Sequence, residues 1–220
     1  MNYFITGGTG FIGHNLIGEL LKKKKKATIY VLVRKNSKKK FETLKAQWGT
    51  AAKRVVPITG DLTRPMLGIP AKKRRALEGE VGHVFHLAAV YDLMADAESQ
   101  MQVNVDGTHN VVKFAENIKA RRFHHMSSIA AAGLYPGIFR EDMFEEAHGL
   151  DNPYFRTKHD SEAVVRRECH VPWRVYRPGI VVGHSETGVI DKIDGPYYFF
   201  KLIQKMRCLL YTSDAADELT

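Results

Sequence analysis

The sequence predicts an α/β protein built on a doubly wound, mostly parallel sheet of six to seven strands. Apolar runs alternate with stretches of helical periodicity, the first run leads into a glycine-rich turn, and polar residues follow the runs. Because crossovers between parallel strands are right-handed, ligands are expected at the carboxyl ends of the strands, where the strand order reverses. Six runs are interpreted as strands: 2–6, 28–34, 54–59, 83–87, 123–127 and 173–177.

Two stretches between the expected strands have the spacing of amphipathic helices. The first places one apolar face toward the sheet, and the second outlines a longer helix. Their apolar positions are Leu16, Ile17, Leu20 and Leu21 in the first, and Val103, Val111, Val112, Phe114 and Ala115 in the second.

A glycine-rich turn joins the first strand to the first helix and predicts a phosphate-binding loop. One glycine allows a sharp turn, a second allows the backbone to approach a diphosphate, and a third allows close packing of helix and strand. Two registers fit, one starting at Gly7 and the other at Gly8, and both stay open. The residues assigned to the loop are Thr6, Gly7, Gly8, Thr9, Gly10, Phe11, Ile12 and Gly13.

Composition excludes several classes of protein. The chain has 220 residues, 44% of them hydrophobic, and a net charge of +9, but its lysine and arginine runs are scattered and lack interleaved aromatic residues. This distribution argues against a nucleic-acid partner. No apolar run approaches the roughly 18 residues of a membrane span, and no leader peptide is recognised, so a cytoplasmic protein without a transmembrane span is expected.

No metal site is expected from the cysteines and histidines. Cys169 and Cys208 form no short-spaced pair. The histidines near the expected strands have no carboxylates at ligand spacing, so structural or surface roles are expected for His83, His86, His124 and His125.

The expected domain organisation has three parts: a nucleotide-binding domain over 1–183, the start of a substrate-binding portion over 184–207, and a non-native tail over 208–220. The last segment resembles the in-frame translation of a sequencing adapter. The natural chain is therefore expected to continue beyond Arg207, so that the substrate lobe is truncated here.

The end of the second expected strand indicates which dinucleotide is bound. An acidic residue there normally binds the ribose hydroxyls of NAD, whereas a basic one accommodates the phosphate of NADP. This strand ends in Arg34, followed by Lys35. A guanidinium can form two parallel hydrogen bonds to a phosphate, so NADP is favoured and NAD stays possible. In the alternative interpretation Arg34 is only a surface charge.

Tyr154 and Lys158 are the candidate acid/base pair. Four residues apart, they share one face of a helix that Asn152 can cap and Pro153 can begin. The helix start, the lysine and an oxidised nicotinamide would all favour phenolate, lowering the tyrosine pKa from its reference value of about 10. The phenol would then serve as a general acid/base.

Taken together, the motifs resemble the extended short-chain dehydrogenase/reductase family. They occur in the order of that family and cover most of residues 1–183. Besides the glycine loop they are Gly60-Asp61-Leu62, His86-Leu87-Ala88-Ala89, Asn104-Val105-Asp106-Gly107-Thr108, Ser127-Ser128 and Tyr154-x-x-x-Lys158.

The resemblance implies a Rossmann fold and a role for each motif. Ser128 would hydrogen-bond the reacting oxygen that Tyr154 protonates, Lys158 would also hold the nicotinamide ribose, and Asn104 would support a proton relay. Ser127 competes with Ser128, which is preferred because it lies five residues before Gly133. The remaining cofactor positions implied are Asp61 and Leu62 beside the adenine, Ala88 and Ala89 along the cleft, and Pro178.

Within the family, two segments are similar to the branch of fatty acyl-CoA and thioester reductases, also called the male-sterility type. They are Gly60 to Ile69 and Arg177 to Gly183. That branch uses NADPH to reduce an acyl thioester to an aldehyde or alcohol.

The expected function is therefore an NADP-dependent oxidoreductase acting on a small carbonyl or acyl-thioester substrate. One alternative is a nucleotide-sugar epimerase or dehydratase with bound NAD, from which Arg34 leans away. A second is a redox sensor that binds NADP without turnover, against which the complete set of Ser128, Tyr154 and Lys158 weighs. The oligomeric state stays open; because many relatives pair through a four-helix bundle, the resemblance implies a homodimer as one possibility.

Overall fold

The computed structural model describes residues 1–90, 96–190, 197–200 and 202–206. Six strands form one parallel sheet in the order β3-β2-β1-β4-β5-β6. The strand order reverses between β1 and β4, as in a doubly wound Rossmann sheet. The strands are β1 (Asn2–Thr6), β2 (Ile29–Val33), β3 (Val55–Thr59), β4 (Val81–His86), β5 (Arg122–Met126) and β6 (Trp173–Tyr176).

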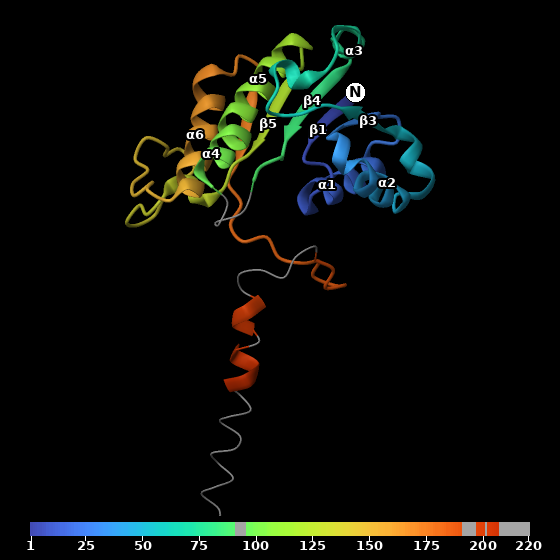
Figure 1. Ribbon diagram of the computed structural model, residues 1–220. Helices are drawn as coiled ribbons and strands as arrows, with labels where there is room; N and C mark the ends of the chain where they lie inside the picture. The colour runs from blue at the N-terminus through green and yellow to red at the C-terminus, as the bar shows by residue number, and fades with distance from the viewer. Residues whose placement is uncertain (91–95, 191–196, 201, 207–220) are drawn as a thin grey trace, which may run out of the picture. The chain divides into compact units, whose positions relative to one another are not determined.

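Helices cover both faces of this sheet (Figure 1). The α-helices are α1 (Phe11–Lys23), α2 (Lys38–Ala46), α3 (Ala71–Leu77), α4 (Ala97–Gln100), α5 (Gly107–Asn117) and α6 (Pro153–Glu168). Short turns of 3₁₀-helix are η1 (Lys35–Ser37), η2 (Gly49–Arg54), η3 (Pro65–Gly68) and η5 (Ile129–Ala132), and η4 (Met101–Asp106) is a π-helix.

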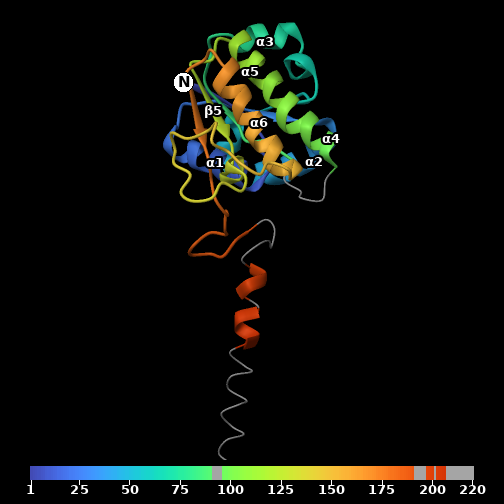
Figure 2. The ribbon, with the colours of Figure 1, turned by 90° about the vertical axis from the view of Figure 1, so that its left-hand side faces the viewer.

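The two faces of the sheet form two separate cores, as the alternation of side chains along a strand requires. On one face α1 and α2 pack over β1, β2 and β3, through side chains such as Ile5, Ile17 and Phe41. On the other face α5 and α6 pack side by side, through Phe114 and Val165 among others (Figure 2). The fold class predicted from the sequence is confirmed.

The expected strands differ from the observed ones only at their ends, by one or two residues. The first compact unit of the chain spans Met1–Gly179, and the second spans Ile180–Thr220. Within the second unit, residues 197–200 and 202–206 are helical, and the amide of Gly183 donates to the hydroxyl of Tyr197 at 2.7 Å. The expected non-native tail, 208–220, lies outside the described residues.

No helix among the described residues has the length and apolar character that crossing a membrane requires.

Candidate functional site

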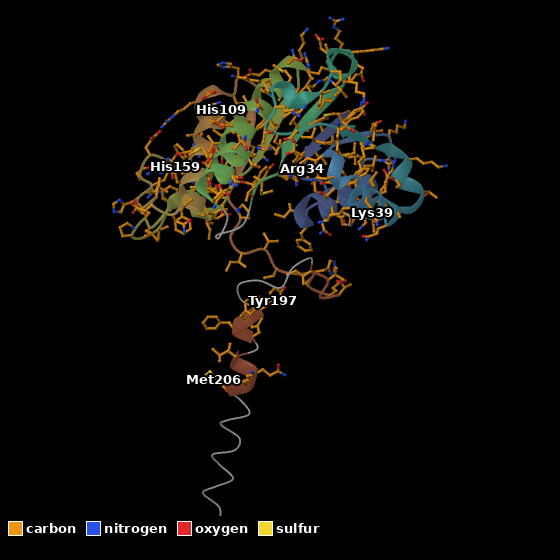
Figure 3. The ribbon with its side chains drawn as sticks, in the orientation of Figure 1. Arg34, Lys39, His109, His159, Tyr197 and Met206 are labelled. Carbon is orange, nitrogen blue, oxygen red and sulfur yellow. The ribbon has the colours of Figure 1, made fainter. Side chains whose placement is uncertain are left out.

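The carboxyl edge of the sheet gathers the residues expected to form the site. Because all six strands run parallel, the segments that follow them meet at one edge. Within two residues of the ends of β1 to β6, in order, lie Gly7, Arg34, Asp61, Ala88, Ser128 and Pro178. Arg34 is labelled in Figure 3.

The glycine loop after β1 depends on three glycines for different reasons. Gly7 has a φ of +71°, and a Cβ there would lie 2.6 Å from the amide nitrogen of Ala88. A Cβ on Gly8 would lie 2.6 Å from Cγ1 of Val31, and one on Gly13 would collide with the carbonyl of Gly7. Both registers of the motif therefore contain glycines that the protein itself requires.

The fourth glycine, Gly10, is different because little protein surrounds it. It is exposed, and its φ of −88° suits any residue. A Cβ added to Gly10 would have the carbonyl oxygen of Gly7 as its nearest contact, at 3.4 Å. It is the N-cap of α1, and no side chain caps that helix. The first amides of a helix lack intrahelical partners and favour an anion. This loop therefore fits the diphosphate of a dinucleotide.

Arg34 and Asp61 stand at the ends of β2 and β3. Arg34 is exposed. Asp61 accepts hydrogen bonds from the amide and the hydroxyl of Thr63, at 3.0 and 2.9 Å. The amide of Thr63, together with its hydroxyl and the charges of Arg34 and Arg64, holds the pKa of Asp61 below its usual value. An ionised carboxylate and a guanidinium thus lie close together at this edge.

Leu62 differs from its neighbour Asp61, because it packs partly buried against the core under α5. Its carbonyl oxygen accepts a hydrogen bond from the side chain of Asn110 at 2.7 Å.

A buried hydrogen-bond chain, which the sequence did not predict, connects β1 to η4 through His86. The amide of Ala88 donates to Oγ1 of Thr6, which contacts Nδ1 of His86 at 2.8 Å. On the other side of the ring Nε2 contacts Oγ1 of Thr108 at 3.0 Å, and that hydroxyl donates to the carbonyl of Asn104. Burial, then the charge of Lys158, lowers the pKa of His86 to about 3, so the ring stays neutral.

Asn104 lies in the π-helix η4, and its buried side chain is occupied by protein groups. Its Oδ1 accepts from the amide of Val90 at 2.8 Å, and its Nδ2 donates to the carbonyl of Val90 and to the hydroxyl of Thr157, both at 3.2 Å. It therefore ties the segment after β4 to the first turns of α6. Irregular π turns of this kind are common at functional sites.

The start of α6 carries the candidate acid/base pair. Asn152 caps the helix by accepting from the amides of Tyr154 and Phe155, at 2.8 and 3.4 Å, and Pro153 is its first residue. Tyr154 lies in the first turn and is 8% exposed. This local arrangement agrees with the one expected from the sequence.

Lys158 lies one turn further along α6 and is almost completely buried. Its ammonium group donates to the carbonyl of Met126, the last residue of β5, at 2.8 Å. Burial lowers its pKa to about 8, against an opposing effect of Glu162.

The two adjacent serines after β5 have different partners. The hydroxyl of Ser127 is buried and donates to Oε2 of Glu162 at 2.7 Å. Oγ of Ser128 instead accepts from the amide of Ala130 at 3.1 Å, so its own hydrogen stays available to donate. Helix α6 packs against η5, the short helix that Ser128 begins.

Glu162 and Arg177 are the charged residues of this region that the sequence prediction missed. Glu162 is fully buried and pairs with both Arg166 and Arg177 at 2.7 Å. The available signal was its spacing: Glu162 follows Lys158 by four residues, on the helical face that also carries Tyr154. Among the described residues no cluster could hold a metal ion.

Comparison with known proteins gives consistent relatives. The family model described as "Male sterility protein" matches residues 5–219. The chain is 32% identical over 205 residues to a linear gramicidin synthase polypeptide of Brevibacillus parabrevis, covering 86% of this chain and 4% of that protein. It is 30% identical to the fatty acyl-CoA reductase wat of Drosophila melanogaster, covering 88% of this chain and 46% of the relative.

Among solved structures, the terminal R domain from the myxalamid PKS-NRPS biosynthetic pathway is similar, with a TM-score of 0.77 and 28% identity. The match covers 88% of this chain and 52% of that domain. The chain thus spans about half the length of that domain and of the fatty acyl-CoA reductase, and 4% of the gramicidin synthase polypeptide.

Proposed function

The chain belongs to the male sterility protein family, and from this premise we propose that it is an NADP(H)-dependent reductase of a carbonyl or acyl-thioester substrate. The names of its relatives, which include a fatty acyl-CoA reductase and a terminal R domain, support the reaction type. The site residues support the chemistry.

The cofactor would lie along the carboxyl edge, across the point where the strand order reverses. The amides at the start of α1 would hold its diphosphate, Asp61 and Leu62 would border the adenine, and Arg34 would bind the ribose phosphate of NADP. Ala88, Ala89 and Pro178 would line its path toward the nicotinamide. When bound, the reduced nicotinamide would supply a hydride to the substrate carbon.

The residues of this chain would manage the oxygen and its proton. Ser128 donates a hydrogen bond to the substrate oxygen, and Tyr154 gives that oxygen a proton. The ammonium of Lys158, one helical turn away, stabilises the phenolate that Tyr154 leaves behind. With a thioester substrate, the resulting hemithioacetal passes its hydroxyl proton to the departing sulfur as the carbon–sulfur bond breaks, and aldehyde and thiol are released.

The observation that carries this proposal is the burial of Lys158 beside Tyr154. A lysine is almost never buried without a reason, and burial here brings its pKa to about 8, near working pH. Its ammonium also contacts Met126, two residues before the candidate serine. Lysine, tyrosine and serine are thus held by one helix and one strand end.

The test uses the protein expressed from the longest reading frame that contains residues 1–207. It is mixed with NADPH or NADH and with a panel of acyl-CoAs, aldehydes and nucleotide sugars, while nicotinamide absorbance is followed. Loss of NADPH absorbance with an acyl-CoA or an aldehyde supports the proposal. Conversion of a nucleotide sugar without net absorbance change favours an epimerase, and tight NADPH binding without any turnover favours a sensor.

A further inference from the structure

Glu162 makes more connections than any role assigned so far requires. Its two carboxylate oxygens accept four hydrogen bonds. Oε1 accepts from Arg166 and Arg177, each at 2.7 Å, and Oε2 accepts from Ser127 at 2.7 Å and from Arg177 at 3.1 Å. Arg177 therefore forms a bidentate pair with the Glu162 carboxylate, the strongest geometry for an arginine–carboxylate interaction.

These bonds join three segments that each carry a residue of the proposed site. Glu162 belongs to α6, like Tyr154 and Lys158. Ser127 directly precedes Ser128, and Arg177 directly precedes Pro178. The carbonyl of Pro178 in turn accepts from the amide of Ile129 at 3.1 Å, closing the connection on the far side of Ser128.

Helix α6 also bonds to two successive residues, the last residue of β5 and the one after it. Lys158 holds the carbonyl of Met126, and Glu162, one turn later, holds the hydroxyl of Ser127. Because the hydroxyl of Ser127 donates its hydrogen to Glu162, Ser128 is the serine whose hydroxyl can donate to a substrate.

We propose that Glu162 is a positioning residue for the reductase reaction, which fixes Ser128 as the working serine and balances the charge of Lys158. The inference rests on the proposed function. It concerns a residue that acts through Ser127 and Lys158 and touches no substrate.

The groups that surround Lys158 decide in which direction its pKa should move when Glu162 is changed. On its own helix are Tyr154 and Glu162. His86 of β4 and His125 of β5 also face it. Burial, and then the charge of Lys158, lowers the pKa of each ring well below its usual value. Both rings are therefore neutral at physiological pH. Burial raises the pKa of Glu162, but the hydrogen bonds from Arg177, Ser127 and Arg166 together outweigh it and hold that pKa below its usual value, so the carboxylate is ionised.

Two charge-neutralising substitutions should move the titration of Lys158 in opposite directions. Glu162→Gln removes the carboxylate and leaves two arginines uncompensated, so Lys158 should titrate below its present pKa of about 8. Arg166→Gln removes a cation from the same cluster and leaves Arg177 on the carboxylate, so Lys158 should titrate above that value. A merely structural role would not give opposite signs.

The titration is measured by NMR of the lysine side-chain signals, with Lys158→Arg to assign the signal of Lys158. Opposite shifts in the two variants support the inference. No shift in Glu162→Gln, or shifts of the same sign in both, overturns it. This measurement needs no turnover, so it remains decisive even if the wild-type protein reduces no substrate, a result that would defeat the proposed function instead.

Ser127→Ala tests whether Glu162 places Ser128, and it removes only one buried hydroxyl. We expect kcat to fall by roughly tenfold, because small displacements of a catalytic group are costly, while KM for NADPH stays unchanged. Wild-type kcat in Ser127→Ala would overturn the part of Glu162 in placing Ser128. If Glu162→Gln does not fold, Arg166→Gln and Ser127→Ala decide the inference, since both leave the pair of Glu162 with Arg177 in place.

Discussion

Helices α1 and α6 both begin near the carboxyl edge of the sheet, yet their first turns are built differently. The N-cap of α1 is Gly10, which offers no side-chain cap, whereas the N-cap of α6, Asn152, accepts from the first amides of its helix. An uncapped start offers its amides to an external anion. A capped start satisfies those amides within the chain, and the positive end of its dipole then acts on the side chains of its first turn. One start is thus suited to a phosphate group, and the other to the phenol of Tyr154.

The surroundings of the two starts follow the same division. The α1 loop is held by backbone approaches that exclude any Cβ, such as Gly7 against Ala88. The α6 region is held by buried charges and polar side chains, including Lys158, Glu162 and Asn104. A binding loop needs an open backbone, whereas an acid/base site needs side chains locked in place. Substitutions at the two starts should therefore separate affinity from rate.

The largest expected effect is on rate and comes from Tyr154→Phe at the start of α6. Loss of the general acid should lower kcat by roughly 10²- to 10⁴-fold and leave NADPH affinity nearly unchanged. Tyr176→Phe, which removes a phenol bonded to His124, is the matched control and should keep its rate. Steady-state kinetics measure both, and undiminished turnover in Tyr154→Phe would remove the phenol from the mechanism.

On the α1 side, Arg34→Asp should change affinity without changing the acid/base step. Exchanging a cation for an anion beside the ribose phosphate should weaken NADPH binding by roughly 10- to 100-fold, the value of one or two charge-assisted hydrogen bonds. Lys53→Asp makes the same charge change at an exposed position before β3. Equal NADPH affinity in the two variants, measured by fluorescence titration, would place Arg34 outside the binding site.

The buried ammonium at α6 should also appear in the pH dependence of stability. Lys158 has a pKa of about 8 in the fold against 10.5 in its ordinary state. Between these values the unfolded chain binds more protons, so stability rises with pH across this window. Wild type should gain about 2 kcal/mol relative to Lys158→Met between pH 8 and pH 10. Parallel urea-unfolding curves of the two proteins over that window would contradict this.

A smaller effect is expected from removing the cap of α6. Asn152→Ala should lower the free energy of unfolding by about 1 kcal/mol, because the amides of Tyr154 and Phe155 lose their acceptor. Asn152→Asp keeps an acceptor and should retain most of that stability. Denaturant unfolding measures the difference, and NADPH affinity should not follow it, since α1 is untouched.

Much of the fold was predictable from local patterns. The six strands, the turn at Gly7 and the cap at Asn152 each depend on residues close together in the sequence. The strand boundaries shifted because hydrogen bonding to neighbouring strands, rather than apolar character, decides where a strand begins. The fourth strand, for example, begins at Val81, which pairs with Asn2.

The connections inside the site were less predictable because their partners are distant in the sequence. Glu162 meets Ser127 and Arg177 only after α6 packs against the ends of β5 and β6. His86 was expected to be structural, but its bonds to Thr6 and Thr108 depend on the pairing of β4 with β1 and its packing under η4. The π-turn around Asn104 has no periodicity that marks it in advance.

The most direct test gives α1 the kind of cap that α6 already has. In Gly10→Asp the new carboxylate can accept from the first amides of α1 and would occupy the place proposed for the diphosphate. Gly10→Ala is the control, because it adds a Cβ at the same point without a charge. Calorimetric titration with NADPH should show binding at least roughly tenfold weaker in Gly10→Asp than in Gly10→Ala. Equal NADPH affinity in the two variants would contradict the assignment of this helix start to the cofactor.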